Sequence, residues 1–439
     1  AERVNKWTER KEKIEKEIAS LQAEIDDICF NLYGIDGVDR AQIEHGLGGN
    51  ATDSAASSEE IKELDATPLV SSLLSWCVGV AFGRFDLRLA TGEREAPPEP
   101  DPFDPLPICS PGMLTGEYGL PLDDPPPDYA INFPLDGILV DDLGADRDLV
   151  ARSRQVFEHI FDDPSARWEE AAGILGDRDQ VLRSWFARQF FGLHIKQYSK
   201  SRRKAPIYWQ LATSSASYST WLYYHRFTQD TLFRLLNDHI TPKLQHEERK
   251  LTNLIQEVGP NPTTSQGKEI DTQETFVGEL RGLRDEITRV APLWNPNLND
   301  GVILNFAPLW RLVPQHKAWQ KECKSAWNKL CKGDYDWAHL AMHLWPERVV
   351  PKCAEDRSLA IAHELEEAFW YEDDDGKWQQ KSVSQKEIEN LIAARTSPAV
   401  KDAVKTLQEA PSPNLTGPQK IKKSRTQKRT TASKSAKQK

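Results

Sequence analysis

Basic and aromatic residues stand side by side in one short stretch, SRRKAPIYWQLATSSASYSTWLYYHRF, residues 201–227. Lys and Arg side chains hold phosphate groups, while aromatic rings stack on bases or fill a hydrophobic core. Arg202, Arg203 and Lys204 precede Pro206, whose missing N–H favours the start or the edge of a strand. We therefore expect this basic triplet to be exposed at the entrance of a β-hairpin, facing DNA or an acidic partner.

The alternative for the same stretch is structural. Aromatic and β-branched residues on both arms would form a hairpin that covers helices. Because side chains alternate along a strand, Trp209 and Leu211 share one face, and Tyr208 and Gln210 share the other. We expect Trp209 and Leu211 to be buried against helices. The residue types alone leave both interpretations open, a DNA-facing hairpin and a purely architectural one.

A second basic segment lies at the end of the chain. Residues 410–439 carry nine Lys or Arg and no acid, so the net charge of −11 leaves −20 for residues 1–409. An acidic body with a basic tail suggests a polyanionic partner. The tail has too few large apolar residues to offset its ordering entropy, so we predict disorder and weak attraction to nucleic acid. Its candidate DNA-binding residues are Lys420, Lys422, Lys423, Arg425, Lys428 and Arg429.

No complete catalytic, cofactor or metal motif is present in the sequence. DPPP at 124–127 is similar to the tetrapeptide with which amino methyltransferases hold the amine of a flipped base, but the aromatic fourth residue is missing. His339 and His343 have the i, i+4 spacing of zinc ligands on a helix, yet no close Cys pair accompanies them. A glycine-rich phosphate loop is also missing. We expect no catalytic residue, cofactor or metal in this chain.

Helices must position these residues, because strand patterns are scarce. A 4-3 spacing of apolar residues predicts a long N-terminal helix, ended by Gly34, that packs along a helix of the same chain or of another. The seam consists of Ile14, Ile18, Leu21, Ile25, Ile28 and Leu32. Residues 97–127 hold 11 of the 28 prolines and predict an extended insertion. Further helices are expected at 147–161, 165–174, 178–191, 229–254, 273–291, 315–332, 335–345 and 355–371, and after Ser384 and Ser397.

The expected fold is mainly α, with one small antiparallel β-hairpin. We predict a helical spacer with the heptad-like seam (1–66), an apolar helix with the Pro-rich insertion (67–146), a helical domain with the aromatic hairpin at 206–227 (147–300), a C-terminal helical domain (301–410) and the disordered basic tail (411–439). Six cysteines without CxxC pairs indicate reduced thiols and a cytoplasmic protein. Apolar runs are too short for a membrane helix. Because the chain opens within a helical pattern and its first Met is Met113, we interpret it as part of a longer protein.

Four stretches of the sequence carry a family likeness. IDDICFNLYGI (25–35) is similar to the end of the long helix that follows the methylase core in fused type II restriction–modification enzymes. LLSWCVGVAFGRFDLR (73–88), RRKAPIYWQL (202–211) and LNDGVILNFAPLWRL (298–312) resemble PglX-type adenine-specific DNA methyltransferases of the BREX and related DISARM phage-defence systems. The likeness extends over about residues 14–371, without the Pro-rich insertion and the tail.

The resemblance implies a non-catalytic role for this chain. Members of that family carry an S-adenosylmethionine-binding core with an Asn-Pro-Pro-Tyr motif upstream of these stretches, and this sequence has neither. It therefore resembles their C-terminal portion, a helical spacer and domain that contacts duplex DNA or other defence proteins. We expect the chain alone neither to bind S-adenosylmethionine nor to methylate DNA. Two hypotheses remain open: a DNA-clamping portion of an adenine-N6 methyltransferase, and a protein–protein scaffold without DNA contact of its own.

Overall fold

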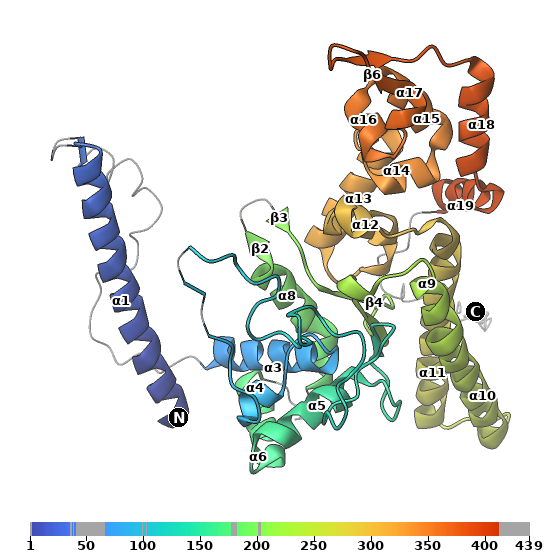
Figure 1. The fold of residues 1–439 in the computed structure, drawn as a ribbon. Coiled ribbons are helices and arrows are strands. Elements are labelled where there is room, and N and C mark those ends of the chain that lie inside the picture. The colour runs from blue at the N-terminus through green and yellow to red at the C-terminus, as the bar shows by residue number, and fades with distance from the viewer. Residues whose placement is uncertain are drawn as a thin grey trace, which may run out of the picture. The chain divides into compact units, whose positions relative to one another are not determined.

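The computed structural model describes residues 2–35, 37, 39–40, 66–98, 100–101, 103–176, 182–200 and 203–411. The basic tail lies outside them. The chain divides into two compact units: Ala1–Leu73 with Ile174–Gly176, and Leu74–Gly173 with Asp177–Lys439. The predicted class is confirmed, because helices dominate and the sheets are small and antiparallel (Figure 1).

The first unit contains the predicted long helix, α1 (Glu2–Leu32). Gly34 ends it with a positive φ of 65°, and the N–H of Ile35 reaches back to the carbonyl of Phe30 at 2.9 Å, so the predicted glycine cap is confirmed. The six seam residues are 45–77% exposed. The residues described in this unit therefore leave the seam uncovered, and the helix that was expected to pack along it is not found among them.

A three-stranded antiparallel sheet lies at the centre of the second unit. Its order is β1 (Ile138–Val140), β5 (Ser219–Tyr223), β4 (Tyr208–Ala212), and every residue of the three strands is buried. The β4–β5 pair is the predicted hairpin, with Trp209 opposite Leu222. Trp209 and Leu211 are both 0% exposed, as predicted. The sheet is covered on both faces, so Tyr208 and Gln210 are buried as well.

Aromatic helices pack against this sheet. The predicted helix at 178–191 is described from Leu182 and continues further, as α7 (Arg183–Trp185), a π-helical turn (Phe186–Phe190) and α8 (Phe191–Gln197). The ring of Phe190 lies 5.1 Å from that of Trp221 in β5. Before them come α3 (Thr67–Ala81), α4 (Arg88–Thr91), α5 (Leu149–Ile160) and α6 (Pro164–Ile174). The Pro-rich segment 97–127, apart from 99 and 102, contains no helix, as predicted.

Two long helices form an antiparallel pair beside the sheet (Figure 1). The first is continuous through α9 (Thr231–Arg234), a π-helical turn (Leu235–Ile240) and α10 (Thr241–Val258). The second, α11 (Thr264–Val290), begins nine residues before the predicted start at 273. The reason is a capping box between Thr263 and Gln266, which stabilises the first turn in a polar segment.

The C-terminal part of the second unit consists of shorter helices. They are α12 (Val302–Phe306), α13 (Lys317–Lys332), α14 (His339–Leu344), α15 (Pro346–Glu355), α16 (Arg357–Ala362), α17 (Glu366–Phe369), α18 (Gln385–Arg395) and α19 (Pro398–Glu409). The prediction of a single helix at 355–371 is wrong. It breaks because Glu364 takes a left-handed φ of 56° and the chain then enters the hairpin β6 (Trp370–Glu372)–β7 (Trp378–Gln380).

Candidate nucleic-acid interface

The basic triplet lies on a two-residue antiparallel ribbon before the aromatic hairpin. The ribbon pairs β2 (Ser199–Lys200) with β3 (Arg203–Lys204), and Arg202 falls outside the described residues. Arg203 is exposed, as predicted. Lys204 is only half-exposed, because its Nζ forms an ion pair with Glu322 of α13. The expectation of a fully exposed triplet is therefore corrected at Lys204, which fastens the ribbon to a helix.

Like charges face each other across this ribbon. The Cα atoms of Lys200 and Arg203 are register partners, and both side chains are exposed. Neither has an ion pair with any residue that the structure describes. Like charges directly opposite in a strand pair are destabilising, so the fold itself gains nothing from this arrangement. It suits an external polyanion, whose phosphates would relieve the repulsion.

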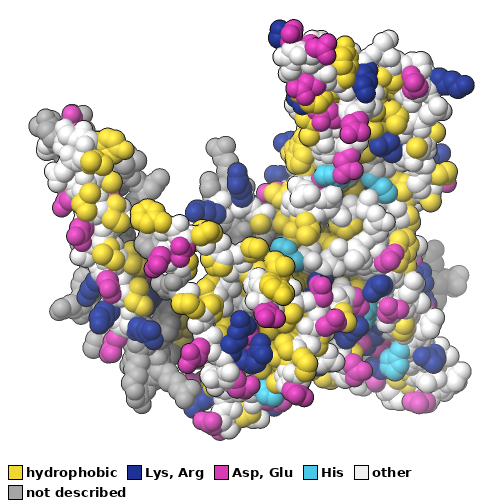
Figure 2. All heavy atoms as spheres, in the orientation of Figure 1, with side chains coloured by type: hydrophobic (Ala, Val, Ile, Leu, Met, Phe, Trp, Pro, Cys, Tyr) yellow, Lys and Arg dark blue, Asp and Glu magenta, His cyan; other side chains and the backbone are white. Residues whose placement is uncertain are grey.

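The helix that Lys204 contacts carries a second group of exposed cations. Lys317, Lys321 and Lys324 follow an i, i+4, i+7 spacing and form one stripe of α13. The buried side of the helix carries Trp319 and Trp327 instead. In Figure 2, dark-blue side chains gather near the β2–β3 ribbon. We use the name basic surface for the exposed cations of both elements, Lys200 and Arg203 on the ribbon and Lys317, Lys321 and Lys324 on α13, which the Lys204–Glu322 ion pair connects.

The aromatic residues of the opening stretch do not belong to this surface. Tyr208, Trp209 and Trp221 are at most 1% exposed, and Tyr223 is 6% exposed. Their rings therefore cannot stack on nucleic-acid bases without unfolding the sheet. The Tyr208 ring instead stacks on Phe82, with centroids 5.0 Å apart. The aromatic residues of the stretch therefore have a structural role in the core, whereas Arg203 and Lys204 lie at the surface.

His194 of α8 holds the start of the hairpin in place. Its Nε2 accepts hydrogen bonds from the N–H groups of Ile207 and Tyr208, both at 3.0 Å. The side chain is completely buried, and burial lowers its pKa to about 3, with the nearby charge of Arg84 adding to the effect. His194 therefore stays neutral, with Nε2 as an acceptor, and fixes the start of β4 at all pH values near neutrality.

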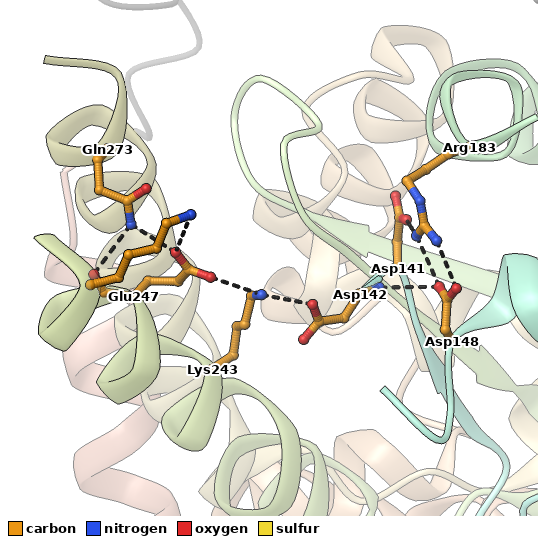
Figure 3. A network of polar contacts seen from close by, with 8 residues as sticks. Asp141, Asp142, Asp148, Arg183, Lys243, Glu247 and Gln273 are labelled. Atoms are coloured by element: carbon orange, nitrogen blue, oxygen red, sulfur yellow. Dashed lines mark hydrogen bonds and ion pairs between the residues drawn. The ribbon is translucent and has the colours of Figure 1, made fainter. Parts of the chain in front are cut away.

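A buried network of charges fixes the elements on the other side of the sheet (Figure 3). Arg183 binds Asp148 through two hydrogen bonds of 2.9 and 2.6 Å and also pairs with Asp141. Asp148 is the N-cap of α5, because its carboxylate accepts the N–H of Ala151. Burial raises the pKa of Asp141 to about 6, although Arg183 opposes this shift.

The same network reaches the long helical pair. Lys243 of α10 contacts Asp142 at 2.7 Å and Glu247 at 2.9 Å. Gln273 of α11 donates to the carboxylate of Glu247 at 2.7 Å. The backbone N–H of Asp142 donates to the carboxylate of Asp148 at 3.3 Å. Charge-assisted hydrogen bonds thus connect the end of β1, the N-cap of α5, α7 and both long helices. We interpret this network as structural.

The residues considered for catalysis or metal binding have other contacts. His339 donates through Nδ1 to the buried carboxylate of Asp300 at 2.9 Å, and burial lowers the pKa of His343. Among the described residues, no three His, Cys, Asp or Glu side chains are grouped as possible metal ligands. Beside DPPP at 124–127, the hydroxyl of Tyr129 accepts the N–H of Leu87 at 2.8 Å, so that ring is held by the fold. Lys420, Lys422, Lys423, Arg425, Lys428 and Arg429 lie outside the described residues.

The fold and the basic surface define a mainly helical protein with a candidate polyanion interface. No family model matches the chain. It is 26% identical to the adenine-specific methyltransferase BrxX of Escherichia coli O9:H4 (strain HS) over 144 residues, which are 32% of this chain and 12% of that protein. It is also 26% identical to the adenine-specific methyltransferase PglX of Lacticaseibacillus casei (strain Zhang) over 184 residues, 39% of this chain and 15% of that protein.

These matches bear out the resemblance drawn from the sequence: the chain is a relative of PglX/BrxX-type adenine-specific methyltransferases over about a third of its length. The matched part covers less than one sixth of either curated protein. In the part of the chain that the structure describes, no helix is both long and apolar enough to cross a membrane.

Sequence reasoning missed most of the basic surface. Lys200 was not singled out, because a two-residue strand of Ser and Lys carries no β-sheet signal. The lysine stripe of α13 could have been found, since Lys317, Lys321 and Lys324 share one face of a predicted helix. What the sequence could not supply is the ion pair between Lys204 and Glu322, which are 118 positions apart.

Proposed function

We propose that this chain is the C-terminal, non-catalytic portion of a site-specific adenine-N6 DNA methyltransferase of a cytoplasmic phage-defence system of the BREX or DISARM kind. In this proposal the basic surface clamps duplex DNA, while another part of the parent enzyme binds S-adenosylmethionine, flips the base and transfers the methyl group. The similarity to BrxX and PglX supports the family context. The observation that carries the DNA contact is the uncompensated pair of Lys200 and Arg203 across the ribbon.

The basic surface would act through the DNA backbone. Lys and Arg side chains that neutralise phosphates release condensed counterions, which gives affinity without reading sequence. Such contacts set the position of a protein on the duplex, whereas base edges supply the specificity. With Tyr208, Trp209 and Trp221 buried, base stacking has no part in this contact. The proposed role is therefore backbone clamping.

Removing Lys200 and Arg203 of the ribbon, together with Arg202 of the basic triplet, tests this function. We expect Lys200→Ser, Arg202→Ser and Arg203→Ser together to weaken duplex DNA binding uniformly across sequences, because fewer phosphates are then neutralised. The slope of log K against log salt should become shallower by roughly 0.9 for each phosphate that the variant no longer neutralises. Fluorescence anisotropy with a labelled duplex over a range of NaCl concentrations measures both quantities.

Lys204→Ser is the matched control for this experiment. The same charge is removed one position away, but from a side chain that is already paired with Glu322. We expect a smaller change in the salt slope than for the triple variant. An unchanged affinity and slope in the triple variant, with thermal unfolding like that of the unmodified chain, would refute the DNA contact of the ribbon.

The exposed seam of α1 favours a second candidate, an interaction scaffold for other defence-system proteins. Six large apolar residues, among them Ile18 and Leu32 at 60% and 77% exposure, form a stripe suited to another helix. This candidate does not require any DNA contact. The salt titration separates the two candidates, because a scaffold without DNA contact shows no salt-dependent binding of duplex.

A further inference from the structure

Three arginine side chains converge on one cavity of the second unit, away from the residues of the basic surface. The cavity has a volume of about 260 Å³ and is lined by Arg147, Arg152 and Arg234. Arg147 directly precedes the N-cap of α5, Arg152 lies on α5, and Arg234 ends α9. The segment from Asn132 to Asp136, with Leu139 of β1, forms the rest of the wall.

Only one of the three cations is neutralised. Arg147 binds both carboxylate oxygens of Asp136, at 2.6 and 2.5 Å, and Asp136 is the one acidic residue in the lining. Arg152 donates through Nε to the backbone carbonyl of Asp146 at 2.8 Å and through Nη1 to the amide oxygen of Gln155 at 3.3 Å. Both of these acceptors are uncharged, so the positive charge of Arg152 remains.

Arg234 makes fewer polar contacts than Arg152. Its guanidinium makes no hydrogen bond or ion pair with any residue that the structure describes, and its side chain is exposed. The lining of the cavity therefore carries two positive charges in excess of its single carboxylate. The pKa of His239, five residues further on, is lowered mainly by burial; the charge of Arg147 adds to this shift, and the charges of Asp136 and Asp238 oppose it.

The backbone next to Arg234 is unusual as well. The helix changes directly after it into the π-helical turn Leu235–Ile240. Such turns are rare and concentrate at functional sites. Within this turn the Nε2 of His239 is buried and has no hydrogen-bond partner among the described residues. Leu235 and Ile240 at the two ends of the turn are buried in the core, but their packing does not explain the unpaired Nε2 of His239.

We propose that this cavity is a binding site for a phosphate group. Arg152 and Arg234 hold the phosphate, and Arg147, whose guanidinium is bound by Asp136, forms part of the cavity lining. Guanidinium groups present planar N–H forks that match phosphate oxygens, and they stay charged at every physiological pH. Nη2 of Arg152 and the whole Arg234 guanidinium have no hydrogen-bond partner among the residues that the structure describes, so they can donate to a ligand. The phosphate can come from a DNA backbone or from a small phosphorylated molecule, and only the first source rests on the function proposed above.

The test compares two charge-matched double variants of the full 439-residue chain. Arg152→Gln with Arg234→Gln removes the two free cations of the site. Arg154→Gln with Arg167→Gln is the control, because these exposed arginines pair with Glu158 and Glu170 and do not line the cavity. Inorganic phosphate is titrated by calorimetry and by thermal shift, with chloride at the same ionic strength as the reference, since phosphate also stabilises proteins non-specifically.

We expect the unmodified chain and the control variant to bind inorganic phosphate equally, and the cavity variant to bind at least ten-fold more weakly. Arg234→Gln alone should already weaken binding, and it cannot disturb the fold by breaking a hydrogen bond or ion pair, because its guanidinium has none within the described residues. Absence of phosphate binding by the unmodified chain, or equal binding by the cavity variant, overturns the proposal.

Duplex DNA distinguishes the two sources. If the site holds a backbone phosphate, the cavity variant should also show a salt slope that is shallower by roughly 0.9 than that of the control. If the phosphate belongs to a small molecule, the salt slope stays unchanged while the binding of inorganic phosphate is abolished. Either result supports the site. A failure of the ribbon variant to affect DNA binding would instead reject the proposed function and leave this site standing.

Discussion

Trp209→Ala is expected to lower the free energy of unfolding by about 3–5 kcal/mol, the range for truncating a buried Trp. The side chain is 0% exposed, and its ring lies 4.5 Å from that of Phe306 and 4.7 Å from that of Phe227. Its indole N–H donates to the carbonyl of Pro206 at 2.9 Å. The substitution thus creates a large cavity and leaves a buried carbonyl without its donor. Urea unfolding followed by fluorescence or circular dichroism measures the loss.

Trp337→Ala is the matched control for this prediction. Trp337 is 47% exposed, so most of its surface is already in water and little transfer free energy is lost. We expect a loss below about 1 kcal/mol. Equal effects of the two substitutions would contradict the position of Trp209 in the core and, with it, the assignment of the hairpin as architecture.

Arg183→Met is expected to destabilise the protein by about 3–5 kcal/mol at pH 8, because it leaves two buried carboxylates without their cation. The side chains of Asp141 and Asp148 are only 7% and 2% exposed, and Arg183 itself is 26% exposed. Met has a similar length and is apolar, so the cavity term is small. Urea unfolding at fixed pH values from 5 to 8 measures the free energy of unfolding.

The pH dependence of this variant has a definite sign. Burial raises the pKa of Asp141 to about 6 in the folded protein, so the folded state binds this proton more tightly than the unfolded state does. Proton binding therefore adds to the free energy of unfolding at low pH, and this contribution is lost as the pH rises through 6. Without Arg183 the preference for the proton becomes stronger. The deficit should therefore be largest at pH 8 and shrink as pH falls toward 5. Arg167→Met, which breaks an exposed pair with Glu170, should cost less than about 1 kcal/mol at every pH. A deficit for Arg183→Met that does not depend on pH would contradict the network.

Elements with local signals were predictable from the sequence. Ser384 and Glu387 form both hydrogen bonds of the capping box at the start of α18, as their spacing indicates. The apolar and aromatic alternation likewise located β4 and β5. Thr263 and Gln266 form the same capping box at the start of α11, nine residues before the helix predicted at 273–291. The start of α11 was therefore readable from the sequence.

Other features depend on contacts that no local pattern encodes. β1 consists of three residues and pairs with a strand about 80 positions later, and Glu364 breaks a helix with a left-handed conformation that usually signals glycine. Lys204 of the ribbon pairs with Glu322 of a distant helix. The arginine cavity combines positions 147, 152 and 234, which share no motif spacing. Such sites arise from tertiary structure. The sequence therefore predicted the basic triplet at 202–204, but neither the pairing of Lys200 with Arg203 nor the arginine cavity.

Binding of duplex DNA through backbone phosphates is the central property proposed for this chain. Its most direct test is the affinity of the 439-residue chain for duplexes of unrelated sequence, measured at NaCl concentrations between roughly 50 and 200 mM. We expect log K to fall linearly with log salt, with a slope of roughly −2 or steeper, and to be similar for all duplexes. No measurable binding at the lowest NaCl concentration, or an affinity that does not change with salt, would contradict the claim.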